Sequence, residues 1–585
     1  VNAGLVGIGS LAVGDDNIVS SGNGGLVEAG VAGLVSVGIG DGNEVRATNG
    51  GVVEAGLIGM GGLAYGDDSS VALYNAPPGS VDAGLAGMVG VAIGDRDVVD
   101  VTNAGGVTAG LIGIGGLVSG DDGSVTVSNG VDGAVDAGLA GMIGVAIGDG
   151  NAVSATNEGS VSAGLIGVGG LVVGNDSSVT VLNEGTGTSS AGIAGLLGVG
   201  VGDDNGISVT NSGDVLSGLI GAAGLAVGDN NTVEAANTGV VDVALAGVVG
   251  VGVGDLNAIS ATNSGVVHGD LVGVGGLAFG IDNEVTVANT STGTVSGGFA
   301  GLVGVAVGDA NGVTVANDGD ISSVLIGAGG LLVGDTGSVS VSNGADGAIG
   351  AGIAGVVGVA IGDGDTVTAA NEGSVGAGLI GVGGLVVGEG STATIVNEGP
   401  GSAVKRGFAA LIGVGIGAGD RVSLTNNDDV AAGVIGIGGL AVGDNTRVDA
   451  VNGGVVDASV AGMLGLGFGE DTAVRMTNNG VVTGGQIGMA GLAVGDDGSV
   501  LASNSVTGSI DAGLAGMVAA GVGDMAFVSA SNYGEVQAGL VGIGAVGVGD
   551  GGPTMANNYG LVDAGVAGVV AIGVGDGAAV TSDNT

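Results

Sequence analysis

The sequence predicts an all-β fold, a parallel β-solenoid of about 22 coils of about 26–28 residues that alternate in pairs of about 54 residues. Three observations lead to this prediction: a unit of about 27 residues that recurs along the chain, strand-like alternation within the unit, and glycine at 142 of 585 positions. We expect a single solenoid over residues 1–585, with an irregular coil near 398–430 and no separate catalytic domain.

Two columns of residues mark the repeat. A Gly-Asp turn recurs at Asp95, Asp121 and Asp149, and an asparagine follows each turn by eight or nine residues. Stacked asparagine amides hydrogen-bond to the coils above and below and tolerate left-handed turns, so the second column predicts a structural ladder rather than a binding site. Its candidate members are Asn103, Asn129, Asn157, Asn183, Asn211, Asn237, Asn263, Asn289, Asn317, Asn343 and Asn371.

The residues between these marks alternate as strands do. In NAVSATNEGSVSAG, residues 151–164, Val and Ala alternate with Ser and Thr before an Asn-Glu-Gly turn. In AGLIGVGGLVVG, residues 163–174, Gly fills five of the twelve positions. Each glycine costs a helix about 1 kcal/mol relative to alanine, so strands and turns are the consistent prediction for both halves of the unit.

The units are of two kinds. GLIGIGGLVSGDD at 110–122 is followed by GLAGMIGVAIGDG at 138–150. In the first kind the third position is Ile and the sixth is Gly, whereas in the second kind they are Ala and a bulky aliphatic residue. Large side chains would then lie beside small ones in the next coil, which predicts close packing between stacked coils.

Charge, cysteine content and the length of the apolar runs exclude several classes of function. The chain has 57 acidic residues against 7 Lys and Arg, a net charge of -50, which argues against nucleic acid as a partner. With no cysteine, disulfides and thiolate sites are excluded. The apolar runs end after about 12–16 residues, short of the ~20 that a membrane helix needs, so no transmembrane span is expected.

The chain is not expected to be an enzyme. Its Gly-x-Gly-x-x-Gly strings open no helix and are followed by no Gly-Lys-Ser, so they predict no nucleotide site. The single histidine, His268, has neither an activated serine nor a cysteine nearby in the sequence, so it lacks the partner that general-base chemistry requires. No cofactor is required.

Calcium is the one metal that the acidic turns suggest. GDDN at 14–17 and GDGN at 148–151 place carboxylates and amides in tight turns, as sites for hard cations do. The alternative is that these acids are solvated and keep the chain soluble. The candidate calcium ligands are Asp15, Asp16, Asp41, Asp67, Asp68, Asp121, Asp122, Asp149, Asp203 and Asp229.

The two halves of a coil differ in polarity. The asparagine half shows Ser and Thr outward, whereas the glycine half is apolar on both strand faces, with Leu and Val on one and Ile, Met, Ala and Gly on the other. Strands that are apolar on both faces are usually covered on both. We therefore expect this Gly, Ile and Met face to dock on a second copy of the chain.

The asparagine coils resemble those of a known class of proteins. TNSGDV at 210–215 and TNSGVV at 262–267 are similar to the Asn-Ser-Gly-x-Val coils of autotransporter passenger domains and filamentous-haemagglutinin-like adhesins. VAIGD at 91–95 and 145–149 is similar to the heads of trimeric autotransporter adhesins. The resemblance implies a parallel β-solenoid secreted to the bacterial surface, with an adhesive or matrix role.

The apolar glycine half departs from that resemblance and shifts the functional prediction. It favours a secreted or cell-surface structural protein that associates with itself into a filament, sheath or surface layer. The alternative is an adhesin passenger domain that binds a receptor on a host or neighbouring cell.

Overall fold

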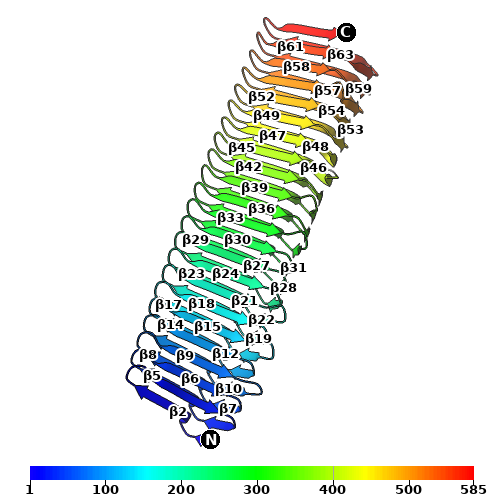
Figure 1. Cartoon of the computed structure of the whole chain (residues 1–585). Helices are drawn as coiled ribbons and strands as arrows, with labels where there is room; N and C mark the ends of the chain where they lie inside the picture. The colour runs from blue at the N-terminus through cyan, green and yellow to red at the C-terminus, as the bar shows by residue number, and fades with distance from the viewer. Residues whose placement is uncertain (400) are drawn as a thin grey trace. The chain divides into compact units, whose positions relative to one another are not determined.

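In the computed structural model the described residues, 1–399 and 401–585, form strands and turns without a helix. The predicted fold class is confirmed: the chain is a parallel β-solenoid of about 22 turns with a repeat of about 26 residues. It divides into two compact units, one of Val1–Val287 with Gly293–Ser296 and the other of Ala288–Thr292 with Gly297–Thr585. Within each unit the strands of successive coils lie side by side (Figure 1). No described segment is a helix that is long and apolar enough to cross a membrane.

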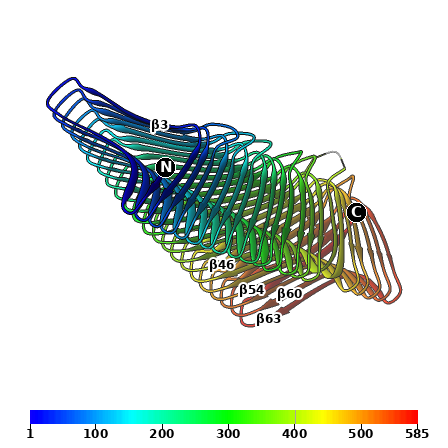
Figure 2. The same ribbon diagram turned by 90° about the horizontal axis from the view of Figure 1, so that it is seen from below.

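A coil of the first unit contains strands of four, eight and six residues. One example is β13 (Gly106–Ala109), β14 (Ile112–Ser119) and β15 (Ser124–Asn129). The four-residue and eight-residue strands belong to one sheet and the six-residue strands to a second. Seen from below, the coils of a unit follow one another as loops of similar outline (Figure 2).

Within each unit, strands pair in parallel with their equivalents in the next coil. The coil after β15 is made of β16 (Ala134–Ala137), β17 (Ala140–Ile147) and β18 (Ala152–Asn157). Val107 pairs with Val135, Leu117 with Val145 and Asn129 with Asn157. Equivalent side chains therefore form straight columns along the stack, which is what lets a residue type repeat as a ladder.

The second unit repeats this pattern and contains two longer strands. β46 (Ala403–Ile416) and β48 (Asp429–Val442) each run where other coils have a four-residue and an eight-residue strand. Their pairing shifts register between Lys405 and Gly407 and again between Gly407 and Ala409. The irregular coil expected near 398–430 covers these shifts, and it includes residue 400, which lies outside the described residues.

The core is built mainly from valine. Val125 and Val127 of β15 and Val135 of β16 alternate inward with polar or small residues facing outward, as a period of two requires. β-Branched residues suit this pleated, half-buried surface. Met142 and Ala146 of β17 close the core from the other side and are fully buried.

The methionines of the eight-residue strands lie in the core, so the expectation that methionine belongs to a docking face is wrong. The reason is a local departure from period two, because Gly141 and Met142 are neighbours and both are buried. A Cβ at Gly141 would lie 2.2 Å from Cγ1 of Val161, so only glycine lets the strand turn its next side chain inward. The same pattern buries Met60, Met88, Met463, Met489 and Met517.

The two kinds of coil alternate as predicted, but on the outside of the sheet. Ala140 pairs with Ile166 and Ile143 with Gly169, so a large side chain lies beside a small one in the next coil. Ile166 and Ile143 are partly exposed, whereas the core residues beneath them are not. The alternation therefore shapes the outer surface of the eight-residue strands rather than the packing of the core.

Candidate functional site

The asparagine column forms a continuous chain of side-chain amides within each unit. Nδ2 of Asn129 donates to Oδ1 of Asn157 at 2.9 Å, and Nδ2 of Asn157 donates to Oδ1 of Asn183 at 2.8 Å. Asn157 also donates to the carbonyl of Gly159 in its own turn. The eleven candidates named from the sequence are at most 1% exposed, which leaves them no surface for a ligand. In this fold they hold the turn of each coil to the next.

The first acid of each turn has a similar structural role. Oδ1 of Asp15 accepts the backbone N–H of Asp41 at 3.0 Å, and Oδ1 of Asp121 accepts that of Asp149 at 2.9 Å. A carboxylate therefore links one turn to the next through one of its oxygens. The candidate calcium ligands with this role are Asp15, Asp41, Asp67, Asp121, Asp149, Asp203 and Asp229.

The other three candidates occupy the next turn position. Asp16, Asp68 and Asp122 are exposed and have left-handed backbones with φ of 57°. Asp, Asn and Gly tolerate this conformation best. Asp68 pairs with Arg96 through two hydrogen bonds of 2.7 and 2.8 Å, and the guanidinium holds the pKa of that carboxyl below its usual value. Nowhere among the described residues do three or more His, Asp or Glu gather so as to hold a metal ion, and calcium binding stays a prediction.

A second buried polar column lies one residue further along the turn, and the sequence reasoning missed it. Oδ1 of Asn43 accepts the backbone N–H of Asn17, and Oγ of Ser177 accepts that of Asn151. Nδ2 of Asn43 also donates to the carbonyl of Gly40 at 2.6 Å. The signal was the Asn or Ser that often ends the GDDN-type turns, which we attributed to solvent or calcium. In the structure this position points inward.

Three carboxyls occupy that inward column: Asp97, Asp365 and Asp420. All are at most 1% exposed, and Oδ1 of each accepts one backbone N–H at 2.8 or 2.9 Å. Oδ2 of each is buried without a hydrogen-bond partner. Burial raises the pKa of all three, that of Asp97 to about 6, and the charges of nearby turn acids add to the effect. A protonated carboxyl offers an O–H where asparagine offers an N–H, so the fold favours the neutral acid.

Replacing Asp97 with Asn is expected to stabilise its coil at neutral pH. Because the pKa of Asp97 is higher in the folded chain than the ~3.9 of the unfolded chain, its stabilising contribution is complete below pH ~4 and is lost as pH rises through about 6. The loss amounts to as much as about 3 kcal/mol by pH 7. An asparagine side chain at this position would not ionise and would keep the hydrogen bond from the Ser69 amide.

Hydrogen exchange of the Ser69 amide, corrected for intrinsic rates, measures this effect. In the wild-type chain its protection should fall between pH 4 and pH 7, whereas in Asp97→Asn it should stay nearly constant. Asp122→Asn removes an exposed acid instead and should behave as wild type. Equal pH dependence in wild type and Asp97→Asn would contradict the assignment.

The outward side of the eight-residue strands forms an apolar face. We define it as the residue before each strand with the first, fourth, sixth and eighth strand residues, which for β20 (Ile166–Val173) are Leu165, Ile166, Gly169, Leu171 and Val173. None of the eight-residue strands contains Asp, Glu, Lys, Arg or His. Leu165 and Val173 are each 38% exposed. The face is thus uncharged along both units, although the chain carries 57 acids.

Glycine at the fourth position leaves recesses in the apolar face. Over Gly61 of β8 (Ile58–Tyr65) the recess is bounded by Ile58 and Leu63 of the same coil and by Val35 and Val89 of the adjacent coils. Its lining is almost wholly apolar. In the coils on either side, valine fills the equivalent place. The face therefore alternates between recess and protrusion, with a period of two coils.

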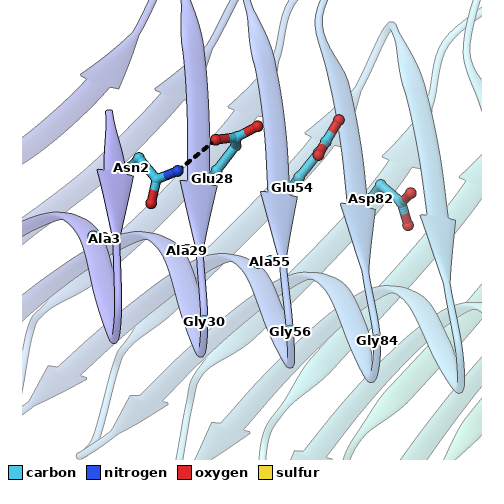
Figure 3. A pocket seen from close by; sticks show the side chains of 10 residues that line it. All are labelled: Asn2, Ala3, Glu28, Ala29, Gly30, Glu54, Ala55, Gly56, Asp82 and Gly84. Carbon is cyan, nitrogen blue, oxygen red and sulfur yellow. Dashed lines mark hydrogen bonds between the residues drawn. The ribbon is translucent and has the colours of Figure 1, made fainter.

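A different recess lies over the four-residue strands near the first residues of the chain. Glu28, Glu54 and Asp82 project from successive coils, and Nδ2 of Asn2 donates to Oε2 of Glu28 at 2.8 Å (Figure 3). The three carboxylates lie side by side on the outside rather than converging on one point (Figure 3). They form no group that could hold a metal ion.

His268, the one histidine of the sequence, lies on β31 (Val266–Gly269) with Nε2 3.6 Å from Oδ1 of Asp270. Both side chains are more than half exposed, at 53% and 67%, so the pair is a surface contact. The features that repeat along the chain are the two buried polar columns, the acidic turns and the apolar face. No family model matches this chain, and no curated protein or solved structure matches it.

Proposed function

We propose that this chain is an extracellular structural protein whose copies associate through the apolar face. One observation carries the proposal: a charge-free aliphatic surface runs along a chain of net charge -50. An aliphatic surface of that extent is costly to leave in water, and it repeats on every coil. The location outside the cell is supported by the resemblance to secreted solenoids, and the proposal includes no catalytic role.

The apolar face is large enough for a stable interface. Eight strand residues span about 26 Å and coils stack at ~4.8 Å, so each coil supplies about 125 Å². About seven adjacent coils would reach the ~800 Å² per partner that a standard interface buries. Each unit contains more coils than that. An interface over one unit would therefore exceed the usual minimum.

Charging the face is expected to abolish association. Leu171→Lys combined with Leu225→Lys places two cations in the sixth position of β20 and β26 (Ile220–Val227), where burial against a partner would leave them unpaired. The matched control, Ser154→Lys with Ser208→Lys, adds the same charge on the outside of the six-residue strands β18 and β24 (Gly206–Asn211).

Sedimentation velocity over a range of concentrations measures the result. The wild-type chain and the control should form species larger than the 53.3 kDa monomer, and the face variant should sediment as a monomer with unchanged circular dichroism. A wild-type chain that stays monomeric at every concentration would overturn the proposal. It would also favour an adhesin that acts as a single chain.

A further inference from the structure

The fourth and sixth positions of the apolar face compensate each other in size. In β14 they are Gly115 and Leu117, whereas in β17 they are Ile143 and Val145. From β5 (Ala32–Ile39) to β44 (Ile380–Val387) one kind of coil has Gly or Ala with Leu, and the other has a bulky aliphatic residue with Val. Within one coil, a recess in one row therefore accompanies the longer side chain in the row beside it.

These two rows flank the middle of the face, which matters for how two copies can meet. If a two-fold axis runs along the stack, the two stacks run in the same direction. The fourth position of each coil then lies opposite the sixth position of the same coil in the partner. Leucine then faces a glycine or alanine recess, and valine faces valine, isoleucine or leucine. If the stacks run in opposite directions, the fourth positions of one copy face the fourth positions of the other, and the sixth positions face the sixth. Two coils of the same kind would then oppose Leu to Leu and Gly to Gly, so only coils of different kinds fit against each other.

Charge separates the two arrangements further. The acidic turn follows the eighth strand position in nearly every coil, so it runs along one edge of the face only. At the other edge lies a Gly-Leu or equivalent, such as Gly164 and Leu165, and Asp270 is the one acid at this position among the described coils. Hydrogen bonds to the next coil, such as that from the Asp149 amide to Asp121, hold the turn carboxylates in place. They cannot turn away from a like-charged neighbour.

Opposed stacks would bring the two acidic edges together. If the stacks run in the same direction, the acidic edge of one copy and that of its partner lie at opposite ends of the eight-residue strands, about 26 Å apart. The Debye length at physiological salt is ~8 Å, so repulsion is largely screened at that separation but not between adjacent edges. Shape permits both arrangements, and charge favours one.

Building on the proposed function, we infer that two copies pair face to face with their stacks running in the same direction, each coil lying on the same coil of its partner. The partner is a second copy because the alternation of recess and protrusion complements itself. An anionic membrane would meet the same acidic edge without any recess to fill. The pair is closed, since one face of each copy is used up.

Single cysteines test this direction, because the chain has no cysteine of its own. Leu63→Cys in β8 and Leu225→Cys in β26 lie in the same row, several coils apart in the first unit. Treated separately with a short bismaleimide, each variant should form a covalent dimer, since equivalent coils meet everywhere in the inferred pair. Ser208→Cys, on the opposite sheet, should stay uncrosslinked.

The outcomes distinguish this inference from the proposed function. In an antiparallel pair only coils near the two-fold axis meet their equivalents, so crosslinking at one position or at neither, in a chain that still dimerises, overturns the direction and leaves self-association intact. A monomeric chain overturns both. Leu117→Cys in β14 and Leu277→Cys in β32 (Val272–Phe279), also several coils apart in the same row, provide a second pair if either variant folds poorly.

Discussion

Replacing Asn183 with Leu is expected to destabilise the first unit by about 3–5 kcal/mol. Asn183 accepts a hydrogen bond from Nδ2 of Asn157 and donates to Oδ1 of Asn211, both at 2.8 Å, and to the carbonyl of Gly187 at 3.1 Å. Leucine would leave these buried groups without a partner in a site that is 0% exposed. Each buried group left unpaired costs about 1–3 kcal/mol.

Guanidinium unfolding followed by circular dichroism, with hydrogen exchange to locate the loss, measures this effect. Exchange is needed because long repeat arrays do not always unfold in one step. Protection should fall first in the coils that contain Asn157 and Asn211. Thr180→Val, on the exposed side of the same strand β21 (Ser178–Asn183), should change little. An unfolding midpoint for Asn183→Leu equal to that of wild type would show that the ladder adds little stability.

Replacing Gly113 with Ala is expected to cost about 3 kcal/mol or more, although the change adds a single methyl group. A Cβ at Gly113 would lie 2.3 Å from Cγ1 of Val135 and 2.5 Å from the carbonyl oxygen of Gly141. The carbonyl belongs to the backbone of the next coil, which cannot retreat without disturbing its pairing to the coil beyond. Overpacking of this kind therefore spreads along the stack.

Gly106→Ala is the matched control, because Gly106 lies in the same coil and a Cβ added there would have nothing within 4 Å. Thermal unfolding should separate the two variants, with Gly113→Ala melting well below wild type and Gly106→Ala close to it. If both variants melted alike, close packing over Gly113 would not be what selects glycine there.

Sequence reasoning succeeded for features that repeat in a straight column. The ladder through Asn157 and Asn183 could be anticipated because parallel coils in register bring equivalent residues together at every turn. The alternation of Ala140 with Ile166 was equally visible. The sequence did not show that this alternation lies on the outer side of the sheet. The side of the strand that faces outward depends on the local break in the two-residue period at Gly141.

The candidate site was harder to predict, for physical reasons that particular residues show. Asp97 and Asp122 both resemble turn acids in the sequence, yet one is buried with a raised pKa and the other is exposed. They differ by one turn position: Asp122 is itself the left-handed residue of its turn, whereas Asp97 follows the left-handed Arg96. Composition alone does not show whether a turn acid points into the core or toward solvent.

Periodicity and composition were enough to predict the fold class, the repeat and the apolar half of each coil. The folded chain was needed to learn that the methionines of the eight-residue strands lie in the core, that Asp97 lies among buried groups, and that the alternation of Gly and Val shapes an outer face. The physical reason is that a single break in the two-residue period exchanges inside for outside, and the close approach of the next coil at Gly141 imposes that break.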